Sequence, residues 1–131
     1  MERNEKTRAL LAAFGCALAY LLAGKALTAV LPQVPEEAAR MWAFVHRCAA
    51  APIVEELVFR GIIQQLARPL GERQAVALQA VLFAVQHRGP AGMAYALVCG
   101  LALGTIRSRT GSVWPGMLLH TLNNLLVFAA G

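Results

Sequence analysis

The sequence predicts an all-α fold: a polytopic bundle of about five transmembrane helices with a candidate active site in the bundle interior. Three observations support this prediction. Hydrophobic residues make up 58% of the 131-residue chain, and only 15% of its residues are charged. A soluble domain is nearer half apolar and a quarter charged. Apolar runs long enough to cross a bilayer recur along the chain, separated by proline and glycine. At this length a single membrane domain, 1–131, is expected.

The first apolar run covers residues 9–31 and follows a charged start at residues 1–8. An α-helix rises about 1.5 Å per residue, so this run can cross a hydrocarbon core about 30 Å thick. A basic start before an apolar run is also typical of a cleaved signal peptide. The run is longer than the apolar part of a usual signal peptide, which favours a retained membrane helix.

Four further helices are predicted after a polar connection. Pro32 and Pro35 end the first helix, and Glu36, Glu37 and Arg40 are expected in a short loop. The predicted helices then cover 41–67, 74–87, 91–106 and 113–130, with turns at 68–73, 88–90 and 107–112. The run 91–106 is rich in glycine and alanine, which suits close helix packing in a membrane.

The basic residues predict which end of the bundle faces the cytoplasm. With a cytoplasmic N-terminus, the inner segments hold Arg3, Lys6, Arg8, Arg68, Arg73, Arg107 and Arg109, and the outer loops hold only Arg40 and Arg88. This asymmetry follows the positive-inside rule. Because the basic residues lie at the ends of apolar runs and not along one face, the net charge of +5 does not indicate a nucleic-acid partner.

Six polar residues interrupt the predicted membrane helices. They are Glu55, Glu56, Arg60, His87, His120 and Asn124. A charged side chain at the bilayer centre costs about 2.5–3.5 kcal/mol, so each needs a reason to be there. Counted from the predicted inner helix ends, Glu55, His87 and Asn124 all lie about 17–20 Å deep. Three helices therefore bring polar groups to a similar level, which predicts one shared site.

The spacing of the first three residues predicts different surroundings for the two carboxylates. Glu56 and Arg60 are four residues apart, share a helix face and can pair. Glu55 is rotated by about 100° from Glu56, so it can face elsewhere and remain free for chemistry. A structural ion pair that helps helices associate is the alternative interpretation of Glu56 and Arg60.

The remaining polar residues repeat the four-residue spacing. His120 and Asn124 lie on one face of their helix, and Phe83 and His87 on one face of theirs, which could place an aromatic ring against the imidazole. Taken singly, His120 could be a packing histidine and Asn124 an interhelical hydrogen-bonding residue. The occurrence of the whole set favours a functional site.

The three motifs together resemble the CPBP family of intramembrane endopeptidases, also called the CAAX protease and bacteriocin-processing or Abi family. Its pattern is EExxxR, FxxxH, then HxxxN or HxxxD; here the pieces are EELVFR from residue 55, FAVQH from 83 and HTLNN from 120. The resemblance covers about residues 48–128, the protease core. It implies an integral protein of the bacterial inner (plasma) membrane. Many relatives carry further helices, so this short chain could need a homo-oligomer or an accessory membrane protein.

The resemblance implies hydrolysis by an activated water. Glu55 with His87 would activate the water, and His120 and Asn124 would donate hydrogen bonds to the developing oxyanion. Such a donor is often worth about 3–4 kcal/mol. The resemblance also implies that the ion pair of the first motif holds the helix rotation that aims Glu55.

Three alternatives stay open. A catalytic zinc site could use Glu55, His87 and His120, which are suitable ligand types. The lack of an HExxH motif favours a mechanism without a cofactor. A non-catalytic bacteriocin-immunity or scaffolding membrane protein could keep the same motifs. A small proton-coupled transporter is less favoured, because five helices with no inverted repeat do not match that architecture.

The expected partners are the lipid bilayer and a membrane-anchored peptide or protein substrate. Relatives cleave prenylated C-terminal CAAX peptides, bacteriocin or signal-peptide precursors, or C-terminal sorting segments. The third helix is predicted to stop at Arg88, Gly89 and Pro90, short of the outer edge. A site open toward the outer side would favour exported substrates.

Overall fold

The computed structural model describes residues 2–30 and 34–131, and within these ranges the chain is helical with no strand. The elements are α1 (Glu2–Val30), α2 (Glu36–Val45), η1 (His46–Ala50), α3 (Ala51–Glu55), η2 (Glu56–Ile63), α4 (Gln64–Leu66), η3 (Arg68–Leu70), α5 (Glu72–Ala84), α6 (Gly89–Thr110) and α7 (Trp114–Ala129). Elements α2 to α4 follow one another without a break and form one long helix. The predicted all-α bundle of five helical rods is confirmed.

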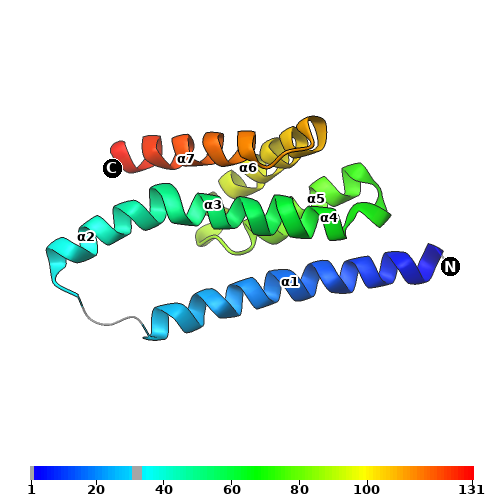
Figure 1. Ribbon diagram of the computed structural model, residues 1–131, viewed down its shortest axis with the longest axis horizontal. Coiled ribbons are helices and arrows are strands. Elements are labelled where there is room, and N and C mark those ends of the chain that lie inside the picture. Colours follow the sequence, from blue (N-terminus) through cyan, green and yellow to red (C-terminus); the bar gives the residue numbers. More distant parts are fainter. Residues whose placement is uncertain (1, 31–33) are drawn as a thin grey trace.

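The rods lie roughly along one direction (Figure 1). Helix α1 runs along most of the molecule, and the long helix α2–α4 returns beside it and extends past its end. Helix α7 lies on the other side of that long helix from α1, and α5 and α6 pack behind it. The motif-bearing η2 contacts α1, α5 and α6, while the neighbouring α3 contacts α7. The first motif therefore lies in the middle of the bundle.

The long helix widens into π-helical turns twice. Pro52 has no N–H to offer the carbonyl four residues earlier, and its ring would clash with that carbonyl. Just before it, in η1, the N–H of Ala51 bonds the carbonyl of His46, five residues back. The wider turn thus accommodates the proline without ending the helix.

The second widened stretch is η2, which carries Glu56 and Arg60. It ends where the N–H of Gln64 bonds the carbonyl of Phe59, again five residues back. Single π-helical turns within α-helices are rare and occur frequently at functional sites. The first motif therefore has an unusual backbone as well as unusual charges.

Two predicted helix starts are wrong, that of the long helix and that of α1. The long helix begins at Glu36, so Glu36, Glu37 and Arg40 form its first turns and not a loop. Two acidic residues in the first turn favour a helix start there, because negative charge is stabilised by the N-terminal end of the helix dipole. The charged start of the chain is also helical from Glu2. The predicted end of the first helix at 31, and Pro32, lie outside the described residues.

The other two corrections concern α5 and α6. Helix α5 ends at Ala84, so His87 lies in the connection to α6, where its N–H bonds the carbonyl of Ala84. Helix α6 continues to Thr110, so the predicted turn at 107–112 is mostly helical. The helix stops where Gly111 adopts the left-handed conformation, with φ of 70°, which glycine reaches without steric cost.

The core lies between α1, η2 and α5. Ala13 and Ala17 of α1 are buried, and their small side chains let α1 approach the aromatic residues of the long helix. Tyr20 packs edge-on against Phe59 with ring centroids 5.5 Å apart, and Phe59 packs on Phe83 at 5.1 Å. Helix α1 is therefore an integral part of the bundle.

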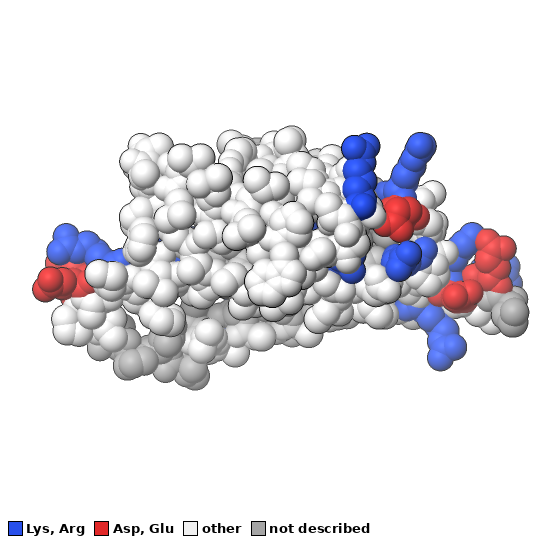
Figure 2. Space-filling view, turned by 45° about the horizontal axis from the view of Figure 1, so that its top comes forward, with Lys and Arg blue, Asp and Glu red and all other residues white. Residues whose placement is uncertain are grey.

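The outer surface is largely apolar. Figure 2 shows charged side chains gathered at the two ends of the molecule, with a broad uncharged band between them. Large apolar residues such as Leu118 (71% exposed) and Val98 (66% exposed) project from this band. By length and composition, the helices over Glu2–Ala29 and Gly89–Thr110 can each cross a membrane. An apolar band flanked by charge is the surface that a bilayer requires.

Candidate active site

Four side chains from the long helix and α7 form a carboxylate–histidine cluster: Glu55, Glu56, Arg60 and His120. Nδ1 of His120 lies 2.9 Å from Oε1 of Glu56, and Nε2 lies 3.6 Å from Oε2 of Glu55. Nη1 of Arg60 lies 3.1 Å from the same Glu56 oxygen. Glu56 and Arg60 are fully buried, whereas the Glu55 side chain is 20% exposed.

The predicted pairing of Glu56 with Arg60 is present. Glu55, in contrast, does not face away from the pair. The two ring nitrogens of His120 point to opposite sides of the imidazole. One ring therefore reaches the carboxylates of both Glu55 and Glu56, although these two residues point in different directions from their helix. The three side chains of the motif and His120 thus form one electrostatic unit.

The hydrogen-bond partners and charges of the cluster indicate which of its atoms carry hydrogen. Nδ1 of His120 must carry a hydrogen, because the carboxylate oxygen of Glu56 only accepts. Two carboxylates and one guanidinium sum to a charge of −1, and an uncompensated buried charge is costly. One further proton neutralises the cluster, and it can lie on Nε2 of His120 or on the facing oxygen of Glu55. These two atoms are 3.6 Å apart, which is longer than a hydrogen bond, so each can bond to a third group.

A glycine and an aromatic ring make room for this cluster. A Cβ atom at Gly116 of α7 would lie 2.7 Å from Oε2 of Glu56, so only glycine lets α7 pass this close. The guanidinium of Arg60 lies 4.5 Å from the centre of the Phe83 ring, a cation–π contact. Gly116 and Phe83 therefore fix the positions of Glu56 and Arg60. Neither of these contacts involves Glu55.

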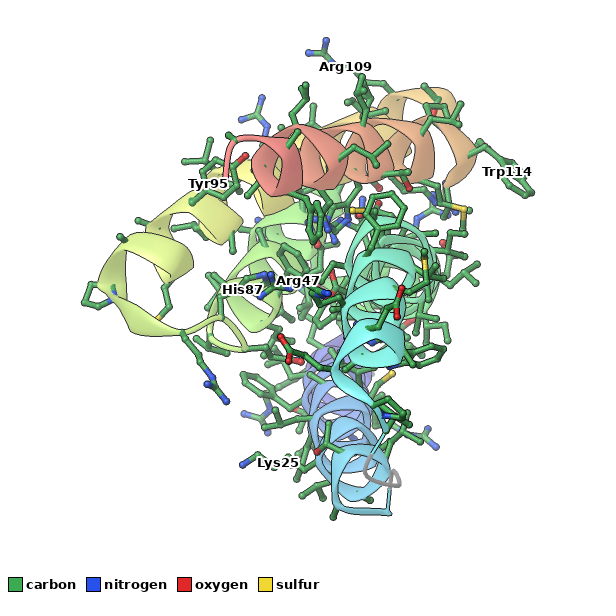
Figure 3. All side chains as sticks on the ribbon, turned by 90° about the vertical axis from the view of Figure 1, so that its left-hand side faces the viewer. Lys25, Arg47, His87, Tyr95, Arg109 and Trp114 are labelled. Atoms are coloured by element: carbon green, nitrogen blue, oxygen red, sulfur yellow. The ribbon has the colours of Figure 1, made fainter. Side chains whose placement is uncertain are left out.

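His87 is beside the cluster but not part of it. Its Nδ1 donates to the carbonyl of Phe83 at 3.0 Å, so in the neutral ring Nε2 is left as an acceptor. The predicted contact of its ring with Phe83 is present at 4.7 Å, and Phe83 in turn lies 5.8 Å from the His120 ring. Figure 3 shows His87 directed toward the interior of the bundle, while Lys25, Arg109 and Trp114 project outward.

Asn124 lies one helical turn beyond His120. Its Nδ2 donates to the carbonyl of Arg47 at 2.9 Å, and its Oδ1 accepts from Asn123 at 3.4 Å. Asn123 itself accepts from the hydroxyl of Tyr95 in α6. One N–H of Asn124 remains for another acceptor. A pocket of about 570 Å³ opens beside it, lined by Arg47, Asn124, Val127, Phe128 and Gly131.

A second polar group in the interior was not anticipated. This glutamine cluster joins the long helix and α5 to α6 and consists of Gln64, Gln79, Gly100, Gly104 and Ser108. Nε2 of Gln64 donates to the carbonyl of Gly104 at 3.0 Å and to Ser108 at 2.9 Å. Nε2 of Gln79 donates to the carbonyl of Gly100 at 2.8 Å. The four-residue step from Arg60 to Gln64 could have identified this glutamine.

A zinc site formed by Glu55, His87 and His120 was the alternative interpretation of the sequence, and the positions of these side chains bear on it. Among residues 2–30 and 34–131, no group of three or more histidine, cysteine, aspartate or glutamate side chains is placed to hold a metal ion. Glu55, His87 and His120 do not form such a group. Nδ1 of His120 faces Glu56 and Nδ1 of His87 is bonded to a carbonyl, so Nε2 of each ring is the nitrogen through which it would bind a metal. The donor types therefore suit a metal, although their positions do not group them around one.

A buried cluster of carboxylates and a histidine inside an apolar helical bundle is typical of a functional site within a membrane. Comparison with protein families places the chain more specifically: residues 37–126 match the model for type II CAAX prenyl endopeptidase Rce1-like proteins. This match covers well over half of the chain, so the protein belongs to that family. The predicted family is thereby confirmed. The protein is an integral membrane protein of the CAAX protease type. No curated protein and no solved structure matches the chain significantly.

Proposed function

We propose that the protein is an intramembrane endopeptidase that hydrolyses a peptide bond of a membrane-anchored substrate with a water molecule activated by Glu55. The observation that carries this proposal is the contact of His120 with both carboxylates at the centre of the bundle. Of the two carboxylates, Glu55 is the more exposed, and its contact with His120, at 3.6 Å, is longer than a normal hydrogen bond. Glu55 can therefore exchange that contact for a water molecule.

The reaction needs one base, which later acts as an acid. Glu55 takes a proton from the water as the water oxygen bonds to the carbonyl carbon, and the carbonyl electron pair moves to oxygen. The protonated Nε2 of His120 and the remaining N–H of Asn124 donate to this oxyanion. When the tetrahedral intermediate collapses, the C–N bond breaks and Glu55 returns its proton to the leaving nitrogen. The products are a carboxyl and an amine terminus.

His87 and the ion pair would have supporting roles. Nε2 of His87 is an acceptor when the ring is neutral, so it can hold the second hydrogen of the water while Glu55 takes the first. The Glu56–Arg60 pair is buried and bonded to Nδ1 of His120, so it fixes the orientation of that imidazole. In this mechanism Glu56 and Arg60 position the site and do not touch the substrate.

The substrate would reach this site from the pocket beside Asn124. That pocket lies at the end of the bundle where α7 finishes, opposite the N-terminus (Figure 1). If the N-terminus is cytoplasmic, as the basic residues predict, the pocket opens toward the outer side. Exported proteins with a membrane-anchored segment, such as C-terminal sorting segments or signal-peptide precursors, are then favoured as substrates.

The proposal is tested by comparing cells that produce wild-type protein, Glu55→Gln or Glu37→Gln, an exposed glutamate at the start of the long helix. Mass spectrometry of membrane and exported proteins identifies new termini. We expect termini that are present with wild type and Glu37→Gln and missing with Glu55→Gln, because removal of a general base typically costs about 10²–10⁴-fold in rate. Wild-type cleavage by Glu55→Gln, at equal amounts of inserted protein, would refute the assignment. An identical set of termini with and without the protein would favour a non-catalytic scaffolding role.

The mechanism without a cofactor has its own test. Purified, active protein is analysed for metals and then treated with a chelator. We expect activity to persist after chelation and no metal in stoichiometric amounts. Zinc in a one-to-one ratio that is lost together with activity would replace this mechanism with a metal-dependent one.

The orientation can be tested by labelling introduced cysteines. Arg73→Cys and Arg88→Cys are placed in a chain whose native cysteines, Cys16, Cys48 and Cys99, are replaced by alanine. A membrane-impermeant thiol reagent added to intact cells should label position 88 and not position 73. The reverse pattern would turn the substrate pocket toward the cytoplasm.

A further inference from the structure

A second pocket lies at the opposite end of the bundle from the one beside Asn124. It has a volume of about 470 Å³, within the range of small-molecule sites, and lies between the end of the long helix and the end of α6. We call it the arginine pocket. Its polar lining consists mainly of Arg60, Gln64, Arg68, Glu72, Arg107 and Ser108.

The arginine pocket carries an excess of positive charge. Of its three guanidinium groups, that of Arg60 is paired with Glu56 and that of Arg68 with Glu72, so the charge of Arg107 is the excess. Glu72 is paired with Arg68 at 3.6 Å, and both side chains are at least half exposed at the mouth of the pocket. Arg107 therefore has no carboxylate of its own among the lining residues. The pocket as a whole favours a negatively charged occupant.

The deeper part of the pocket contains buried donors that lack acceptors. Arg60 is fully buried, and among the described residues its Nε and Nη2 atoms have no hydrogen-bond partner. The Nε atom of Arg107 is also buried without one in the described part of the chain. A buried N–H without an acceptor costs free energy, more so when the group is charged. These donors are satisfied if an oxygen-rich anion enters the pocket.

The chemistry of the donors selects the anion. Guanidinium groups bind planar or tetrahedral oxyanions through paired N–H donors, and phosphate matches them well. Arg60 precedes Arg68 by eight residues, so the pocket extends about 12 Å along the helix from its mouth. The mouth lies at an end of the molecule where basic side chains gather, beyond the uncharged band (Figure 2). That is the level of lipid headgroups.

We propose that the arginine pocket binds the phosphate group of an anionic lipid headgroup, which ties the end of the long helix to the end of α6. This inference does not depend on the proposed proteolysis. The bound phosphate would supply the acceptors that Arg107 and Arg60 lack. Inorganic phosphate offers the same oxygens without the acyl chains, so it is the natural comparison.

The test uses the full-length chain in a neutral detergent, with thermal unfolding as the readout. Phosphatidylglycerol, phosphatidylcholine or inorganic phosphate is titrated into wild type, Arg107→Gln and Arg109→Gln. We expect phosphatidylglycerol, and not phosphatidylcholine, to raise the unfolding midpoint of wild type. Arg107→Gln should need at least about tenfold more lipid for the same shift, because a charge-assisted hydrogen bond is lost. Arg109→Gln, an exposed arginine in the same helix turn that does not line the pocket, should match wild type.

Each outcome decides the proposal. Protection by inorganic phosphate alone, at equal concentration and with the same loss in Arg107→Gln, would support an anion site whose ligand is free phosphate and not a lipid. Equal responses of Arg107→Gln and Arg109→Gln would overturn the site in favour of general attraction to the basic end. No response of wild type to either phosphate source would also overturn it. If Arg107→Gln does not fold, Arg68→Gln at the exposed mouth replaces it with the same expectation.

Discussion

The two polar clusters in the bundle interior differ in what their side chains contact. In the glutamine cluster, neutral amides donate to main-chain carbonyls: Gln64 to Gly104 at 3.0 Å and Gln79 to Gly100 at 2.8 Å. In the carboxylate–histidine cluster, charged side chains contact one another. An amide bonded to the backbone has one stable arrangement and no proton to transfer. Carboxylates that share an imidazole have a proton that can move.

Both clusters need a glycine on the facing helix. A Cβ atom at Gly104 would lie 2.3 Å from Nε2 of Gln79, and one at Gly116 would lie 2.7 Å from Oε2 of Glu56. Close approach of helix backbones is therefore common to both. What distinguishes them is charge, so we expect the glutamine cluster to affect stability and the carboxylate–histidine cluster to affect catalysis.

The largest expected effect belongs to His120→Gln. The variant loses the imidazole that contacts both carboxylates, and with it the proposed donor to the oxyanion. We expect cleavage to fall by about 10²–10³-fold. His46→Gln, an exposed histidine of the long helix, is the matched control and should cleave like wild type. Cleavage by His120→Gln within a few-fold of wild type would remove the distinction between the clusters.

A smaller but more specific effect is expected for Gly116→Ala, which changes no charged or polar side chain. The added methyl group must displace the Glu56 carboxylate, and such overpacking costs about 1–3 kcal/mol of stability. Because Glu56 orients His120, we expect cleavage to fall by up to about 10²-fold, as misplacement of catalytic groups commonly does. Gly92→Ala, where the new Cβ meets no atom within 4 Å, is the control. Equal activity of the two variants would show that Glu56 does not position the site.

The glutamine cluster is tested by Gln79→Leu. Leucine fills a similar volume but removes the amide hydrogen bond to the carbonyl of Gly100, and such a bond contributes about 0.5–1.5 kcal/mol. The unfolding midpoint in detergent should therefore fall. Cleavage per folded molecule should stay within about twofold of wild type. A large loss of cleavage at full folding would mean that this cluster also takes part in catalysis.

The smallest effect is expected for Tyr95→Phe. The variant removes the hydroxyl that donates to Asn123, which in turn donates to Asn124. An exposed hydrogen bond contributes about 0.5–1.5 kcal/mol, so we expect at most about a tenfold loss of kcat and an unchanged KM. An increase in KM alone would place Tyr95 in substrate binding and not in the positioning of Asn124.

The sequence predicted contacts between side chains four residues apart. The Glu56–Arg60 pair is present within the long helix, and the Phe83–His87 contact is present although His87 lies beyond the end of α5. The contact of His120 with Glu56 depends on how closely α7 approaches the long helix, which Gly116 decides. Spacing within one helix contains no information about that distance.

The boundary errors have local causes that the apolar pattern does not register. The long helix begins at Glu36, because acidic residues after a proline favour a helix start although they are polar. Helix α5 stops at Ala84 and leaves His87 in a turn, although the apolar run continues through Val85. The glutamine cluster was not predicted, because a neutral amide costs much less to bury than a charge and so does not by itself indicate a site.

The most direct test of the central claim compares Glu55→Gln with Gln79→Leu in reconstituted vesicles, at equal amounts of folded protein and under single-turnover conditions. The substrate is a membrane-anchored protein identified from the termini that depend on the wild-type enzyme. We predict that Glu55→Gln loses cleavage by at least about 10²-fold, whereas Gln79→Leu keeps the wild-type rate constant within about twofold. Near wild-type cleavage by Glu55→Gln, or an equal loss in both variants, would contradict the assignment of hydrolysis to the carboxylate–histidine cluster.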